Sequence, residues 1–120
     1  MNKNAAESLS VKYLGLELRS PVIVGSCPLT IAPESVRQFV VAGAGAIVLP
    51  SMLQEQIVYQ HSKGGDPVGA LASNGYQPQH DKYNGGVANY LRTIEDLKQL
   101  EGVPIIASLN GGSSGPWLEY

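Results

Sequence analysis

Three apolar runs divide the chain, and small or polar residues follow each of them. The runs are residues 21–24, 46–49 and 104–107. Apolar residues without polar alternation are typical of strands that are buried on both faces, as in a parallel sheet. Right-handed crossovers would bring the carboxyl ends of three such strands to one edge. The pattern therefore predicts three buried parallel strands with a shared polar edge.

Amphipathic patterns fill two of the intervals between these runs. Pro33 suits a first helical turn, apolar residues then recur at helical spacing, and Gly43 marks the stop. A second such pattern runs over residues 87–97 and ends before Gly102. The expected order is therefore strand, helix, strand, helix, strand, which is an α/β arrangement.

Residues 9–19 alternate apolar and polar side chains on both sides of Gly15. Alternation of this kind predicts a two-stranded hairpin with one face in water. Because the buried runs that follow lack this alternation, we expect the hairpin to lie outside the main sheet and to cover one end of it.

Residues 52–86 are irregular apart from a short helix expected over residues 53–59. The segment contains both histidines, His61 and His80, without metal-ligand spacing. Long connections in compact domains are commonly functional lids or disordered. We expect a partly ordered lid.

Charge and composition narrow the classes of partner. Eight basic and ten acidic residues give a formal charge of −2, and they form no runs. This argues against nucleic acid and a membrane surface as partners and favours a small molecule. The single cysteine and the absence of a membrane-length apolar run indicate a soluble, cytoplasmic protein. A homo-oligomer is left open as a partner.

Candidate binding residues lie where the apolar runs end. Small residues there let a backbone approach a flat or phosphorylated ligand, although they also make tight turns. Cys27 has two readings, a reactive thiol and a small buried side chain. The Glu55-Gln56 pair fits both a polar ligand group and an exposed helical face. The candidates are Gly25, Ser26, Cys27, Ser51, Ser108 and Asn110.

Two stretches carry a family resemblance. Residues 9–16 leading into 19–24, and residues 42–51 with Glu55-Gln56 shortly after, are similar to the dihydroorotate dehydrogenase family, especially its dehydrogenase-like members. The resemblance implies a (β/α)₈ TIM barrel with FMN at the carboxyl edge and a hairpin closing the bottom. Residues 1–120 would then be a single partial domain, with the hairpin and the first three β/α units of a truncated barrel.

The resemblance also assigns roles. Gly25 and Ser26 match residues whose backbone lies against the flavin, Cys27 stands where a glycine is common, and Ser51 matches a hydroxyl beside the ring. Ser108 and Asn110 are weaker flavin candidates. Pro50 replaces the lysine of the dihydroorotate enzymes, and their Met-Gly-Leu-Pro run is missing. These departures weaken the expectation that the substrate is dihydroorotate and that the role is in pyrimidine biosynthesis. They leave the expectation of FMN binding in place.

Three hypotheses follow. The first is an FMN-dependent oxidoreductase that transfers hydride from a CH–CH group of a small substrate to flavin, with catalytic residues unknown. The second is a non-catalytic fragment or a subunit that completes its sheet by association. The third is a doubly wound domain that binds a phosphorylated ligand at the glycine-rich residues 111–115.

Overall fold

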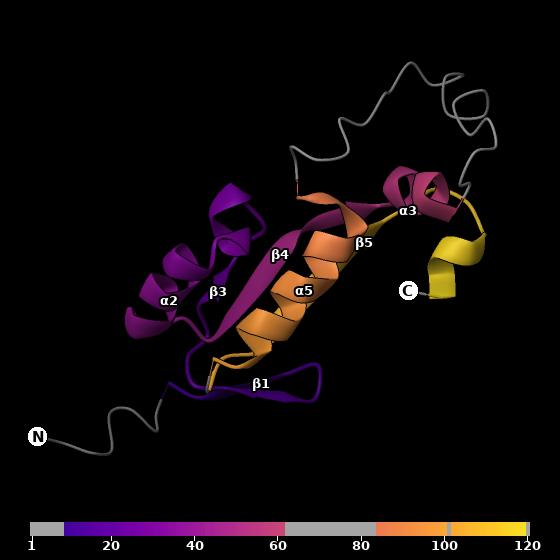
Figure 1. The fold of residues 1–120 in the computed structure, drawn as a ribbon. Coiled ribbons are helices and arrows are strands. Elements are labelled where there is room, and N and C mark those ends of the chain that lie inside the picture. The colour runs from indigo at the N-terminus through magenta and orange to yellow at the C-terminus, as the bar shows by residue number, and fades with distance from the viewer. Residues whose placement is uncertain (1–8, 62–83, 101, 120) are drawn as a thin grey trace, which may run out of the picture.

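The computed structural model describes residues 9–61, 84–100 and 102–119, and they form a mixed α/β fold (Figure 1). The elements, in chain order, are β1 (Val11–Tyr13), β2 (Leu16–Leu18), β3 (Ile23–Val24), η1 (Pro28–Ile31), α2 (Pro33–Val41), β4 (Ala46–Leu53), α3 (Gln54–His61), α5 (Gly86–Lys98), β5 (Ile105–Asn110) and η3 (Pro116–Glu119). The predicted lid, with His80, lies largely outside the described residues.

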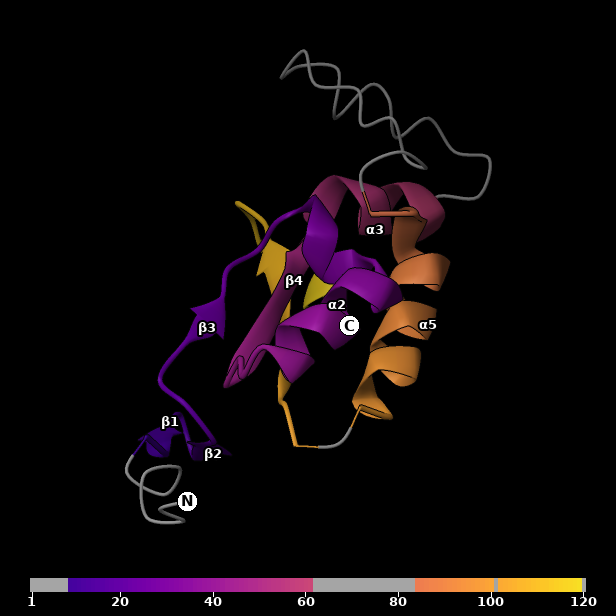
Figure 2. The same cartoon turned by 90° about the vertical axis from the view of Figure 1, so that its left-hand side faces the viewer.

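The main sheet has three strands in the order β3-β4-β5, and both neighbouring pairs are parallel. Ile23 pairs with Ala46, and Ile47 pairs with Ile105. Figure 2 shows α2 and α5 together on one side of β4. The alternation predicted from the sequence is therefore confirmed, with strands adjacent in chain order and the helices on one face.

The hydrophobic core lies between this face and the helices. Burial at helical spacing explains why α2 and α5 form here, because each turns an apolar stripe toward β4. Pro33 occupies the first turn of α2, and Gly43 follows the helix with a φ of 100° that favours glycine. The buried core residues are Val36, Ala44, Ile47, Leu49, Met52, Ile57, Val87, Tyr90, Leu97 and Val103.

Burial of the outer strands differs from the prediction. Val22 is 61% exposed, and both residues of β3 are half-buried. Residues of β5 are half-buried or exposed. The prediction of strands buried on both faces is therefore wrong for these two. They flank β4, and the helices cover one face only. Central β4 has a mostly buried pattern, and it continues past the predicted end at Pro50 to Leu53.

The hairpin forms a separate antiparallel sheet, as predicted. Leu14 and Gly15 at its turn have φ of 49° and 79°, and positive φ at both central residues matches the twist of a two-residue hairpin. In both views the hairpin and α3 lie toward opposite ends of β4 (Figures 1 and 2). Only Leu18 is buried within β1 and β2, so the predicted covered face is reduced to one side chain.

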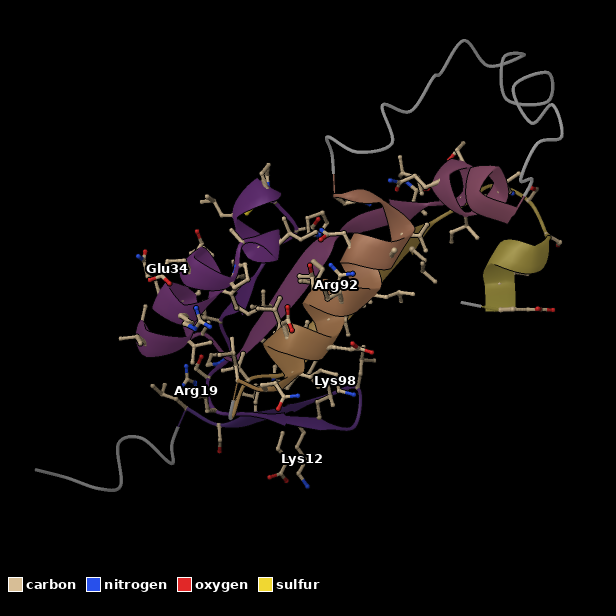
Figure 3. All side chains as sticks on the ribbon, viewed as in Figure 1. Lys12, Arg19, Glu34, Arg92 and Lys98 are labelled. Carbon is tan, nitrogen blue, oxygen red and sulfur yellow. The ribbon has the colours of Figure 1, made fainter. Side chains whose placement is uncertain are left out.

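Arg19 and Ser20 fasten the hairpin to the end of α2. The Arg19 guanidinium donates to the carbonyl of Ala44 at 2.9 Å and also to that of Val40. The Ser20 hydroxyl donates to the carbonyl of Gly43 at 2.7 Å. Figure 3 shows Arg19 close to this end of α2. The approach is so close that a Cβ at Gly45 would collide with the Ser20 carbonyl oxygen.

None of the helices in the described ranges is both long enough and apolar enough to cross a lipid bilayer.

Candidate functional site at the carboxyl edge of the sheet

Two of the predicted site residues meet at the carboxyl edge of the sheet. Ser51 on β4 and Ser108 on β5 are partners in the parallel register. Their hydroxyl oxygens lie 2.8 Å apart, and either hydroxyl can be the donor of this hydrogen bond. Both residues are half-buried, and their hydrogen bond is part-buried. The structure therefore confirms that these two strand ends converge.

A β-bulge in β4 gives Ser51 its orientation. Val48 pairs with Ile106 and Ser51 with Ser108, so β4 advances three residues while β5 advances two. Pro50 lies in the extra length, and a proline has no backbone N–H for the ladder of a central strand. Because two residues of β4 share one position of the ladder, the alternation of faces shifts by one residue. Leu49 and Met52 therefore both face the core, and Ser51 lies on the same face as Val48.

The face opposite the helices changes character along the sheet. Near its amino end the register pairs Val48 with Ile106, and near its carboxyl end it pairs Ser51 with Ser108. Beyond these, Leu53 is paired with Asn110, which is exposed. This face thus carries apolar side chains toward its amino end, and toward its carboxyl end it carries the two hydroxyls and the Asn110 amide beside Leu53.

A buried amide pair lies directly behind Ser51. The side chains of Gln56, on α3, and Asn84, before α5, exchange two hydrogen bonds of 2.7 and 2.9 Å. The Asn84 amide also donates to the Ser51 carbonyl at 3.1 Å. Their oxygens accept backbone N–H groups of Leu53 at 3.0 Å and Gly86 at 3.1 Å. These backbone donors fix which amide atom is oxygen in each side chain.

Tyr90 performs a similar role behind Ser108. It is 2% exposed on α5 and packs in the core. The Ser108 N–H donates to its hydroxyl at 3.2 Å, and that hydroxyl lies 3.4 Å from the Ser108 carbonyl as its donor. The phenol hydroxyl therefore bonds both backbone groups of Ser108, accepting from its N–H and donating to its carbonyl.

Gln54 ties the loop after β5 to α3. Its amide nitrogen donates to the Ser113 hydroxyl at 2.6 Å, and its oxygen accepts the Gly112 N–H at 2.9 Å. The glycine-rich segment was a candidate phosphate cradle, but one of its N–H groups is committed to Gln54. The helix that follows is η3, a four-residue 3-10 turn. A turn this short lacks the aligned peptide dipoles of a phosphate-binding helix.

The remaining predicted residues follow β3, beside β4 on the same edge. Gly25 and Ser26 are exposed, and no heavy atom would lie within 4 Å of a Cβ added to Gly25. Cys27 is half-buried and precedes η1. Its carbonyl accepts the hydroxyl of the buried Thr30 at 2.8 Å.

Basic side chains in the described ranges lie on elements other than the ends of β4 and β5. The basic residues in the described ranges belong to the hairpin region, α2 and α5, and Figure 3 labels four of them. Within those ranges, no three side chains of the metal-ligating types cluster. The hydroxyl pair itself is neutral, and the acidic residue next along the chain is Glu55 in the first turn of α3. The basic residues are Lys12, Arg19, Arg37, Arg92 and Lys98.

Three contributing residues were missed or misread from the sequence. Gln56 was assigned together with Glu55 to a polar ligand group or to an exposed face, and the exposed face is wrong for Gln56 because it is 4% exposed and bonded to Asn84. Asn84 was taken as part of an irregular segment. Tyr90 was predicted only as an apolar helix position. The sequence offered one signal for them. Gln56 and Asn84 carry amides close to helix starts, and Tyr90 carries a hydroxyl on an otherwise apolar helix face.

Comparison with family models, curated proteins and solved structures finds no match to this chain.

Proposed function

We propose that this chain contributes the flavin-binding edge of an FMN-dependent oxidoreductase with a (β/α)₈ barrel. The observation that carries the proposal is the Ser51–Ser108 hydroxyl pair, 2.8 Å between oxygens, at the carboxyl edge of a parallel sheet. In barrels of this class the ligand-binding residues come from that edge.

Strand order supports the barrel over a flavodoxin-like domain. The order β3-β4-β5 follows the chain, and α2 and α5 lie on one face. In a flavodoxin-like sheet the first strand lies between the second and third. A barrel instead adds each strand beside the previous one and keeps its helices outside.

The residues at the edge fit a flavin ring. The open space beside Gly25 and the exposure of Ser26 leave backbone available to a flat surface. Of the two serine hydroxyls, one O–H is used between them, so the other can donate to an acceptor on the ring. The basic side chains described lie elsewhere, so this edge suits the neutral ring rather than the phosphate.

When bound, FMN would supply hydride acceptance, while the protein supplies orientation and a dry environment. Ser51 and Ser108 hold the ring edge by hydrogen bonds, and Gly25 and Ser26 support its plane. The substrate we propose is a small molecule oxidised at a CH–CH group, with its identity left to experiment.

Titration of the native-length protein with FMN tests the proposal. We expect flavin fluorescence to be quenched at micromolar FMN, and Gly25→Ala to weaken binding roughly tenfold because a methyl group would occupy the ring's place. Since that methyl meets no protein atom and alanine restricts the unfolded chain, the free energy of unfolding should not fall. No spectral change with the unsubstituted protein would contradict the proposal.

A second candidate function rests on the outer strands. In the described part of the chain, β3 and β5 each have one strand neighbour, and Val22 and Leu109 are 61% and 48% exposed. Unpaired strand edges favour association. This candidate is a non-catalytic subunit that completes its sheet with another chain. Sedimentation velocity separates the two, because a concentration-independent monomer with cooperative unfolding would contradict association.

A further inference from the structure

Two buried side chains bond the backbone of the residues that form the Ser51–Ser108 hydroxyl pair. Asn84 bonds the Ser51 carbonyl at 3.1 Å, and Tyr90 bonds the backbone of Ser108. Both are buried, with 2% of each residue exposed. Each therefore acts on the backbone of the residue whose hydroxyl faces outward.

We infer that Tyr90 and Asn84 are positioning residues that set the geometry of the Ser51–Ser108 hydroxyl pair for its ligand. The inference rests on the proposed function for the identity of that ligand, FMN. It adds two residues, one from α5 and one from the segment before it, to an edge otherwise built from strand ends.

The bulge explains why such support is required. Between the Val48–Ile106 and Ser51–Ser108 pairs the ladder of β4 and β5 shifts register. Backbone groups at a bulge lose ladder partners, so the strand there is less constrained than regular β-structure. Asn84 supplies a partner to the Ser51 carbonyl on β4, and Tyr90 supplies a partner to the Ser108 N–H on β5.

Tyr90 allows a sharper test than Asn84. Phenylalanine retains the buried ring, whereas any change of Asn84 also disturbs Gln56 and Gly86. Tyr90→Phe therefore removes the support and preserves the packing. Tyr13→Phe is the matched control, because Tyr13 lies on the hairpin and is 46% exposed.

The first measurement is amide hydrogen exchange of the native-length protein without ligand. In Tyr90→Phe we expect the Ser108 amide to exchange at least about tenfold faster, since its acceptor is gone, and in Tyr13→Phe to be unchanged. An unchanged Ser108 rate in Tyr90→Phe would overturn the inference. This arm needs no flavin.

The second measurement is a double-mutant cycle of FMN affinity with Tyr90→Phe and Ser108→Ala. Each substitution should weaken binding roughly three- to tenfold, and Tyr90→Phe should have no further effect once the Ser108 hydroxyl is absent. Effects that multiply independently would overturn the inference. If the unsubstituted protein fails to bind FMN, the proposed function falls, and Ser108 exchange still decides whether Tyr90 fixes this strand.

Discussion

Asn84 uses every hydrogen-bonding position of its side chain. The amide donates to the Ser51 carbonyl and to Gln56, and the oxygen accepts from Gln56 and from the Gly86 N–H. Four hydrogen bonds to three residues, one each on β4, α3 and α5, thus meet at one side chain that is 2% exposed. A satisfied buried network of this kind fixes one arrangement of its members, because any other leaves polar groups unpaired.

Replacement of Asn84 by alanine tests this network. Asn84→Ala leaves buried polar groups of Gln56, Ser51 and Gly86 without their partner, so we expect the free energy of unfolding to fall by about 2–4 kcal/mol. Chemical denaturation would measure this loss as a shift of the midpoint, provided that both proteins have the same m-value. Asn89→Ala, at an exposed position of α5, is the control and should change stability by less than about 0.5 kcal/mol. Equal losses in both variants would refute the network's role.

Periodicity could not reveal this residue-scale chemistry. Gln56 and Asn84 lie 28 residues apart, and two neutral amides carry no spacing rule that pairs them. Ser51 and Ser108 could be predicted together, because both follow apolar runs and parallel strands share an edge. Their 2.8 Å contact depends on the bulge. The only local sign of the bulge in the sequence is Pro50, which precedes Ser51.

At the scale of elements, the helices were predictable, and strand burial was predicted correctly for central β4 but not for β3 and β5. Pro33, Gly43 and the apolar stripes carry local signals that place α2 and α5 correctly. An apolar run, in contrast, specifies a strand without specifying its neighbours. Residues 21–24 were therefore predicted as buried, although β3 has only β4 beside it in the described sheet and Val22 is 61% exposed.

The tether between the hairpin and α2 gives a prediction at this scale. Arg19→Ala removes the guanidinium bonds to the carbonyls of Ala44 and Val40, near the negative end of the helix dipole. We expect a loss of about 1–2 kcal/mol in the free energy of unfolding. Arg37→Ala removes an exposed guanidinium that pairs with Glu34 at 3.4 Å, and should cost under about 0.5 kcal/mol. A thermal melt of both variants would show whether the difference exists.

At the scale of the whole molecule, stability is distributed unevenly. The core lies between β4 and the helices, while the hairpin buries one side chain, Leu18. Local opening requires little free energy where few apolar contacts are lost. The described part of the chain therefore combines a firm centre with a loosely held amino-terminal ribbon.

Native-state hydrogen exchange should resolve these two regions. We expect amides paired within β1 and β2 to exchange at least about a hundredfold faster than those of Ile47 and Leu49 in β4. The reason is that hairpin opening exposes little apolar surface, whereas release of β4 dismantles the core. Similar protection in both regions would mean that the hairpin unfolds with the sheet, and the tether at Arg19 would then have to be stronger than its exposed position suggests.

The bulge at Pro50 has a consequence for how this strand tolerates changes in length. The extra residue sets which face every later side chain of β4 takes. If β4 were regular from Leu49 onward, the Ser51 hydroxyl would face the helices and Met52 would face outward. Deleting Pro50 would remove the extra residue and leave a regular ladder, with Ser51 and Met52 on their present faces. This part of β4 therefore tolerates the loss of one residue, whereas a one-residue change of length in the regular part of the strand exchanges the ligand-facing and core-facing sets together.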